Sequence, residues 1–346
     1  MKDKLYQYTA WLALFIGIIA ILYFGRAFLI PLAFSLVIAT LLKPLLYKLL
    51  GWGAPEWLAI TGSVLAFVLA IGGIVLLMVI QVKSVTKDWP QIQEKAEEIR
   101  SNTQTYISEQ FNVSKETQDK KMEQVLKQAQ SSVGYFFGSA LTFVSNAFLS
   151  IIYIVLFLMQ RRRFLEFGRR IAPAGDRKKM ADAIREAADV SGDYLMGKLK
   201  IMGILAVVYA IGFMIGGVKF GILLAVEAAI FTLIPYVGNL IGGGIAVVFA
   251  MVSGGGTSGA LVVVAVMTLA QLLENYLLQP VIVGDEVDLN PWATIVVVVA
   301  FGMLWGVIGA VIALPLVGMF KVFADRFEPL QPLGFLLGKE PVKQKK

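Results

Sequence analysis

Long apolar runs separated by short polar stretches cover most of this chain of 346 residues. An α-helix needs about 20 mostly apolar residues to cross the hydrocarbon layer of a membrane. Six runs have a length suited to one crossing, so the pattern predicts an all-α, polytopic membrane protein with six full transmembrane helices. These runs are Tyr8 to Phe24, Ala27 to Leu42, Trp57 to Gln81, Tyr135 to Met159, Leu199 to Val218 and Gly259 to Leu278.

Two further runs, Phe220 to Met251 and Trp292 to Phe323, are each 32 residues long. That length suits neither one straight crossing nor two full ones. Proline and glycine interrupt both runs, and these residues remove a backbone donor or permit a sharp reversal. We therefore expect two broken, re-entrant helical hairpins, which a simple count of spans would add as two more crossings. The expected tip and hinge residues are Pro235, Gly238, Gly242, Gly243, Gly244, Pro280, Pro291, Gly302, Gly306, Gly309 and Pro315.

The alternative for both broken runs is a kinked or tightly packed pair of helices, in which glycine only allows close approach. Pattern and length do not separate this alternative from a re-entrant hairpin. If the repeated order of a crossing and a broken run reflects an inverted repeat, the arrangement is one found in many secondary transporters.

The polar stretches divide the chain into six parts. Apolar residues recur at helical spacings in the segment Ser84 to Ser132 and again from Asp176 to Leu195, which predicts amphipathic helices there. Those of the first segment pack on one another, on the membrane surface or on a neighbouring subunit. The parts are transmembrane helices 1–83, an extracytoplasmic helical insert 84–134, a fourth crossing 135–160, a basic loop with an amphipathic helix 161–198, a transport unit with both hairpins 199–324, and a basic tail 325–346.

The charge pattern predicts the orientation of the chain. Lys and Arg number 31 against 24 Asp and Glu, and the segment 161–180 holds eight basic residues against two acidic ones. Basic loops beside transmembrane helices face the cytoplasm. Both termini are therefore expected in the cytoplasm. Because the basic residues lie at the ends of apolar runs, no nucleic-acid partner is expected.

The chain contains no histidine and no cysteine. Their absence excludes disulfides, His-dependent catalysis and the usual nitrogen and sulfur metal sites. No P-loop and no dinucleotide fingerprint occur either. We therefore expect no enzyme activity, no cofactor and no metal, and expect any transport to draw on a gradient.

Polar residues collect at the end of the run from Gly259 to Leu278. Gln271, Asn275 and Gln279 are spaced by four, so on an α-helix they form one stripe, with Glu274 at its edge. Pro280 is expected to stop the helix directly afterwards. The stripe either faces a pathway, as polar groups in membrane helices commonly do, or forms a polar cap at the membrane boundary.

Two other polar residues lie in the first broken run. Glu227 stands among apolar residues, and such a glutamate suits a group that takes up and releases a proton. Its alternative role is a structural hydrogen bond made as the neutral acid. Asn239 follows the expected first tip, and its amide can both donate and accept hydrogen bonds.

Several short motifs in the C-terminal half of the chain carry a family resemblance. They are Ile234 to Gly238, Glu274 to Pro280, Val287 to Pro291, Phe301 to Ala310 and Leu314 to Leu316. Together these motifs resemble the C-terminal signature of the autoinducer-2 exporter family of permeases, although Asn239 stands where the family pattern more often has proline. The resemblance extends in layout over nearly the whole chain, including the soluble insert and the basic loop.

The resemblance implies a multi-pass permease of the cell membrane that forms a homo-oligomer, plausibly a pentamer, in the lipid bilayer. It also implies export of the quorum-sensing signal autoinducer-2 or, alternatively, exchange of sodium or lithium for protons. Amides suit a small, uncharged, hydroxyl-rich solute, which favours the metabolite. We expect alternating access of the transport unit, with Glu227 or Glu274 coupling the step to protons; a channel and a membrane scaffold are the competing classes.

Overall fold

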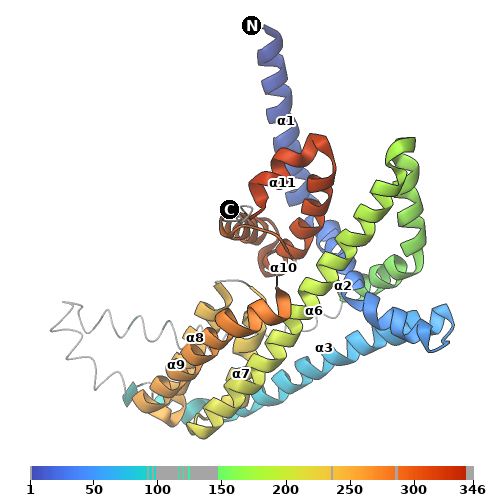
Figure 1. The fold of residues 1–346 in the computed structure, drawn as a ribbon. Coiled ribbons are helices and arrows are strands. Elements are labelled where there is room, and N and C mark those ends of the chain that lie inside the picture. The colour runs from blue at the N-terminus through green and yellow to red at the C-terminus, as the bar shows by residue number, and fades with distance from the viewer. Residues whose placement is uncertain are drawn as a thin grey trace, which may run out of the picture. The chain divides into compact units, whose positions relative to one another are not determined.

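The computed structural model describes residues 2–91, 93–95, 97–98, 116, 120, 124, 147–234, 237–284 and 287–339. Every regular element within these ranges is a helix (Figure 1), which confirms the predicted all-α fold. The elements are α1 Lys2–Phe24, α2 Arg26–Gly51, α3 Glu56–Lys87, helix 147–171, η1 Ala174–Asp176, α6 Arg177–Ile215, α7 Gly221–Phe231, α8 Val237–Ala250, η2 Met251–Gly255, α9 Gly256–Leu273, η3 Glu274–Val283, α10 Pro291–Arg326, η4 Glu328–Leu330 and α11 Gln331–Leu337.

Five of the described helical segments are long and apolar enough to cross a membrane. Many of their large apolar side chains are exposed, as expected for helices that face lipid rather than water. The chain is therefore a multi-pass membrane protein. The five segments are Arg26–Gly51, Glu56–Leu77, Ala174–Ile215, Gly256–Val283 and Pro291–Arg326, and shorter apolar helices lie at Leu12–Phe24, Gly221–Phe231 and Gly238–Ser253.

Some predicted segments lie wholly or partly outside the described residues. They are most of the insert 84–134, the start of the crossing from Tyr135 to Met159, Pro235 at the expected first tip, and the end of the basic tail. The predicted amphipathic helix from Asp176 to Leu195 and the crossing from Leu199 to Val218 form the single long helix α6.

The chain divides into two compact units. The first unit comprises Met1–Phe67, Asn146–Gly197 and Asp285–Lys346, and the second unit comprises Val68–Ser145 and Lys198–Gly284. The expected transport unit 199–324 contributes to both, so its movement as one body stays a prediction. Each unit is described separately below.

Hydroxyl groups and small residues join the helices of the first unit. Ser35 Oγ donates to the carbonyl of Ser150 at 2.9 Å, and the hydroxyls of Thr40 and Ser191 are 2.9 Å apart. At Gly192 a Cβ would lie 2.8 Å from the carbonyl oxygen of Thr40. Close backbone approach at small residues is the usual way in which helices associate in lipid, where apolar contact alone gives no preference.

Helix α10 of the first unit reverses direction at Gly306, which has φ 67° and ψ −151°. A Cβ on Gly302 would lie 3.8 Å from the Cβ of Ala310, although these residues would be about 12 Å apart along a straight helix. A Cβ on Gly309 would collide with the carbonyl of Phe301. The second broken run is therefore a pair of half-helices that meet at Gly306.

Residues 287–291 tie the start of α10 to the C-terminal helix α11. Asn290 Oδ1 accepts from the amide of Ala293 at 2.8 Å, and Asn290 Nδ2 donates to the carbonyls of Leu336 and Gly338. Pro291 occupies the first helical turn, where its missing N–H is not needed. This motif, expected to include a hinge, is thus a helix cap that also binds the end of the chain.

In the second unit, α7 and α8 pack as a hairpin, and α7 runs into turn residues 232–234. A Cβ on Gly242 of α8 would lie 3.1 Å from the Cα of Ala228 in α7. Helix α7 has 11 residues and spans about 16 Å, which is shorter than a hydrocarbon layer of about 30 Å. An arm of this length would end inside a bilayer.

Glycines 242 to 244 lie within α8 and not at the tip, so that expectation is wrong for all three. Gly242 packs against α7, Gly243 faces Met267 of α9, and Gly244 has open space beside it. Gly238 lies in the first turn of α8, where a Cβ would collide with the carbonyl of Phe231. Close helix packing, the alternative explanation for these glycines, accounts for Gly242.

Candidate functional site

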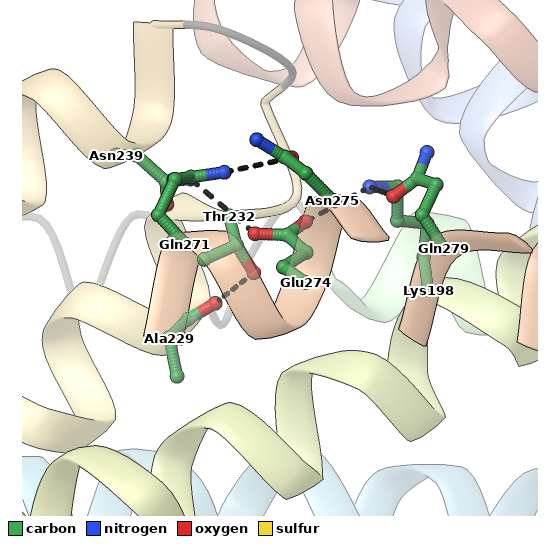
Figure 2. A network of polar contacts seen from close by, with 8 residues as sticks. All are labelled: Lys198, Ala229, Thr232, Asn239, Gln271, Glu274, Asn275 and Gln279. Atoms are coloured by element: carbon green, nitrogen blue, oxygen red, sulfur yellow. Dashed lines mark hydrogen bonds and ion pairs between the residues drawn. The ribbon is translucent and has the colours of Figure 1, made fainter. Parts of the chain in front are cut away.

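Six polar side chains meet in the second unit, beside the tip of the α7–α8 hairpin (Figure 2). Lys198 comes from α6, Asn239 from the first turn of α8, and the others from α9 and η3. We call this set the polar network. Its members are Lys198, Asn239, Gln271, Glu274, Asn275 and Gln279.

Lys198 and Glu274 form the centre of the polar network. Lys198 Nζ lies 3.5 Å from Glu274 Oε1 and donates to Gln279 Oε1 at 3.2 Å. The side chains of Lys198 and Glu274 are only 7% and 6% exposed. A buried charge without a partner is strongly unfavourable. Each of these two residues therefore offsets the cost of burying the charge of the other.

Asn239 connects the hairpin tip to this pair. Its Nδ2 donates to Gln271 Oε1 and, at 3.4 Å, to Glu274 Oε2. Its other polar atom, Oδ1, is buried and accepts no hydrogen bond from any residue that the structure describes. Native structures satisfy almost all buried polar atoms, so this oxygen marks a place where a donor is missing.

The helix continues past Pro280, contrary to expectation. Residues Glu274–Val283 form a π-helix, and the helix ends at Gly284, which has φ 56°. A π-turn closes its hydrogen bonds five residues apart, and this wider turn relieves the clash that proline makes with the carbonyl four residues earlier. The chain therefore passes Pro280 without stopping.

The π-turn also changes which polar residues act together. The spacing of four predicts one stripe of Gln271, Asn275 and Gln279. In the structure Gln271 Nε2 donates to Asn275 Oδ1 at 2.9 Å, whereas Glu274 and Gln279, five residues apart, both contact Lys198. Glu274 is thus at the centre of the polar network and not at its edge.

Lys198 is the member that sequence reasoning missed, because a lysine next to an apolar run is typical of the cytoplasmic end of a transmembrane helix. A usable signal was present. Along α6 the buried residues recur at helical spacing through Ser191, Leu195, Ile201 and Leu205, and Lys198 falls on that same face.

Glu227 does not join the polar network. Both of its carboxylate oxygens are buried, and neither has a hydrogen-bond partner among the described residues. Lys219, the only basic residue close to it in sequence, pairs instead with Asp88 at 2.8 Å and with Gln91. The structural hydrogen bond of a neutral Glu227, which was the alternative role, is therefore not made to any described residue.

The remaining predicted hinge residues lie apart from the polar network. Pro280 is exposed on η3, Pro291 begins α10, and Pro315 is fully buried in the second arm of α10. Gly302, Gly306 and Gly309 belong to the α10 reversal in the first unit.

A second polar feature of this unit is a pocket of about 520 Å³ at the end of α8 opposite to Asn239. Lys219 and the buried Ser253 of η2 contribute to its wall. Ser253 follows Asn239 by 14 residues, which corresponds to about 21 Å along a helix. The pocket and the polar network therefore lie at the two ends of one hairpin arm.

The donor set of the polar network suits hydrogen bonding and not metal coordination. It holds one carboxylate, which a lysine already neutralises, and four amides. Among the described residues no group of three or more acidic side chains could hold a metal ion. Amides present both donors and acceptors in fixed positions, which fits recognition of a polar, uncharged solute.

Ionisable residues buried between membrane helices commonly mark a transport pathway, and Lys198 and Glu274 form such a buried pair in this multi-pass helical fold. Residues 12–328 match the profile of the AI-2E family transporters, and the chain belongs to that family. It is thus a membrane transporter of the permease type.

Relatives of known sequence agree with this assignment. The chain is 27% identical to the "Putative transport protein YrrI" of Bacillus subtilis, over 87% of each chain. It is 25% identical to the "Putative transport protein MT0215" of Mycobacterium tuberculosis, over 91% of this chain and 87% of that one. The "Putative permease PerM" of Escherichia coli is 27% identical over 49% of this chain and 48% of its own.

Proposed function

We propose that this protein exports a small, uncharged, hydroxyl-rich metabolite such as autoinducer-2 across the cell membrane. The observation that supports this proposal best is the free, buried Oδ1 of Asn239. A hydroxyl of the solute would donate to it and complete the polar network. Leaving such an atom unsatisfied costs about 1–3 kcal/mol, which solute binding would recover.

The charge balance of the polar network supports an uncharged solute. Lys198 and Glu274 neutralise each other, so neither charge is left over for an ionic substrate. The amides of Gln271, Asn275 and Gln279 supply donors and acceptors around the pair. A polyol or diketone hydrate uses both kinds of group.

In this proposal the transport unit 199–324 moves relative to the N-terminal helices, by alternating access and driven by a gradient. Asn239 lies directly after the turn of the α7–α8 hairpin, so a shift of the tip would break its hydrogen bonds to Gln271 and Glu274. Both termini lie in the cytoplasm, and the protein acts as a homo-oligomer.

Exchange of sodium or lithium for protons is the second candidate, and Glu227 is the observation that favours it. Its two buried oxygens have no partner in the described part of the chain, so they could accept a cation. Sodium prefers several oxygen ligands, however, and the polar network offers one carboxylate that Lys198 already occupies.

Counterflow in liposomes tests the proposal. Wild-type protein should exchange labelled autoinducer-2 across the membrane with saturation, and Asn239→Leu and Glu274→Ala should each lower the exchange rate at least about tenfold, which corresponds to about 1.4 kcal/mol. Glu166→Gln serves as the matched control, because Glu166 is half exposed and only makes ion pairs within its own helix.

The other outcomes assign the alternatives. Flux that never saturates would indicate a channel. Proton movement driven by sodium or lithium, without autoinducer-2 exchange, would replace the metabolite with the antiport function. If wild-type liposomes show neither autoinducer-2 exchange nor proton movement driven by sodium or lithium, a membrane scaffold is the remaining class.

A further inference from the structure

Glu227 is the single ionisable residue of helix α7, whose other residues are Gly, Ala, Val, Leu, Ile and Phe. Its two carboxylate oxygens are buried, and no donor within the described ranges reaches either of them. Five of the six neighbours within three positions on each side are alanine, leucine or valine. An ionised carboxylate in such surroundings is strongly unfavourable.

The described elements packed against α7 supply no counter-charge. Helix α8 contains no ionisable residue, and α6 between Ile201 and Ile215 contains only the phenol of Tyr209. Trp89, which packs on Leu223 of α7, follows Asp88, and Asp88 is paired with Lys219. Because none of these described elements offers a cation to an ionised Glu227, this arrangement favours the protonated carboxyl.

A purely structural role does not account for this carboxyl. A neutral acid kept for stability would donate its proton to an acceptor, because an unpaired buried hydroxyl is itself costly. Within the described ranges Glu227 has no such acceptor. We therefore expect its ionisable group to act in another conformation, one in which water or a polar partner reaches α7.

The position of Glu227 connects it to the polar network. Its neighbour Ala228 packs directly on Gly242 of α8, which is one helical turn from Asn239. Displacement of α8 along α7 would thus move Asn239 and uncover Glu227 together. The contact between α7 and α8 therefore positions both Asn239, which would contact the solute, and the carboxyl of Glu227.

We propose that Glu227 is a proton-binding site, separate from the polar network, that takes up one proton from one side of the membrane and releases it to the other in each transport cycle. The coupling of this proton to solute transport rests on the proposed function, whereas the binding of a proton at Glu227 does not. The step is –COOH giving –COO⁻ and a proton to water, with the reverse on the opposite side. Export of solute and entry of the proton then share one conformational change.

A metal cation fits this site less well than a proton. Sodium and lithium need several oxygens around them. Among the described side chains of α7 and α8, the unpartnered oxygens are the two of Glu227 and Oδ1 of Asn239, and the latter belongs to the polar network. The hydroxyl of Thr232, the next polar side chain of the hairpin, already donates to the carbonyl of Ala229 at 2.7 Å.

Infrared difference spectroscopy tests directly whether the carboxyl of Glu227 is protonated. At about pH 7 an ordinary glutamate with a pKa of about 4.3 is ionised, so wild-type protein in lipid should show the carbonyl band of a protonated carboxyl that is absent from Glu227→Gln. Glu166→Gln should keep the band, and Glu227→Asp should keep it at a shifted position. Superimposable spectra of the wild type and Glu227→Gln would overturn the site.

Proton movement in liposomes tests the coupling. With a trapped pH dye, wild-type protein should move protons when autoinducer-2 flows down its gradient, and Glu227→Gln should exchange labelled autoinducer-2 with at least about tenfold fewer protons per solute. Glu227→Asp should restore proton movement. An unchanged ratio of protons to solute in Glu227→Gln would overturn the coupling role.

Failure of the proposed function gives a different pattern. If wild-type protein does not transport autoinducer-2 in liposomes, the proposed metabolite function is wrong. The infrared band alone then decides whether Glu227 binds a proton. Proton movement driven by sodium or lithium would in that case have to disappear in Glu227→Gln; if it persists, the coupling role is wrong.

Discussion

Lys198 Nζ and Glu274 Oε1 face each other at 3.5 Å, with less than a tenth of either side chain exposed. The pair joins helix α6 to the π-helix η3 and is the only ion pair in the described part of the second unit with both side chains so deeply buried. Its importance for stability lies less in mutual attraction than in the cost of leaving either charge alone.

Breaking this pair from one side should be costly. Lys198→Met leaves the carboxylate of Glu274 with only the weak hydrogen bond from Asn239 at 3.4 Å, and we expect a loss of about 3 kcal/mol in unfolding free energy. Thermal unfolding in detergent measures the change. Lys43→Met is the matched control, since the Lys43–Asp189 pair is partly exposed and should contribute less than about 1 kcal/mol.

The double variant Lys198→Met/Glu274→Gln separates an unpaired charge from a lost contact. Because it removes both charges, it should recover more than half of the stability that Lys198→Met loses. This account would be contradicted if the double variant lost more stability than the sum of the losses in Lys198→Met and Glu274→Gln.

Gly306 should not tolerate a side chain. Its φ of 67° with ψ of −151° lies in a region that essentially only glycine adopts, while a Cβ there would meet no atom within 4 Å. Gly306→Ala should therefore lose about 2 kcal/mol through backbone strain alone. Gly302→Ala, which makes an ordinary contact with Ala310, should change stability by less than about 0.5 kcal/mol; equal effects would refute a reversal at Gly306.

Packing of the α7–α8 hairpin should depend on Gly242 and not on Gly244. A Cβ on Gly242 would come within 3.1 Å of the backbone of Ala228, whereas Gly244 has nothing within 4 Å. Gly242→Val should lower the unfolding free energy by about 1–3 kcal/mol, and Gly244→Val by distinctly less. Both substitutions place the same residue in the same helix, so the difference in melting temperature reports packing.

Asp288 should make the protein sensitive to acid. Partial burial raises the pKa of this carboxyl, but the hydrogen bonds from the side chain of Lys321 and the amide of Lys339, with the two lysine charges, outweigh it and hold the pKa below its ordinary value. The stabilisation is therefore complete above the unfolded-state pKa of about 3.9. It is lost as the pH falls through the lower folded-state value.

Asp288→Asn tests this assignment. The variant should be less stable than the wild type at about pH 7, and the difference should shrink below about pH 4, as the wild-type carboxyl becomes protonated. Melting curves at the two pH values measure it. A difference that does not change with pH would mean that the carboxyl contributes only as a hydrogen-bond acceptor.

The sequence pattern was sufficient for most of the fold. Apolar runs of a crossing's length mark α2, α3 and α9, and breaks in two longer runs locate the turn after Phe231 and the reversal at Gly306. These features are local, because the length of an apolar run and the conformational freedom of glycine do not depend on neighbouring helices. Close packing at glycine was one of the two expected explanations, but that Gly242 and not Gly244 makes the contact with α7 was not predictable, since it depends on which helix lies against each residue.

The candidate site was predictable only in part. Glu274, Gln271, Gln279 and Asn239 stand out as polar residues within apolar runs. Lys198 did not, because its position at the edge of a run has an ordinary explanation in membrane orientation. The grouping of these residues also depended on a π-turn, for which spacing in the sequence gives no rule.

The sequence by itself determined that this chain spans a membrane through helices, that two of its apolar runs are broken, and which few polar groups are embedded in them. Tertiary structure decided that Lys198 meets Glu274, that Asn239 joins them with one oxygen left unpaired, and that Glu227 has no hydrogen-bond partner among the described residues. The physical reason is that the cost of burying a polar group belongs to the residue, whereas the partner that offsets the cost in the polar network comes from another helix, 32 to 81 positions away along the chain.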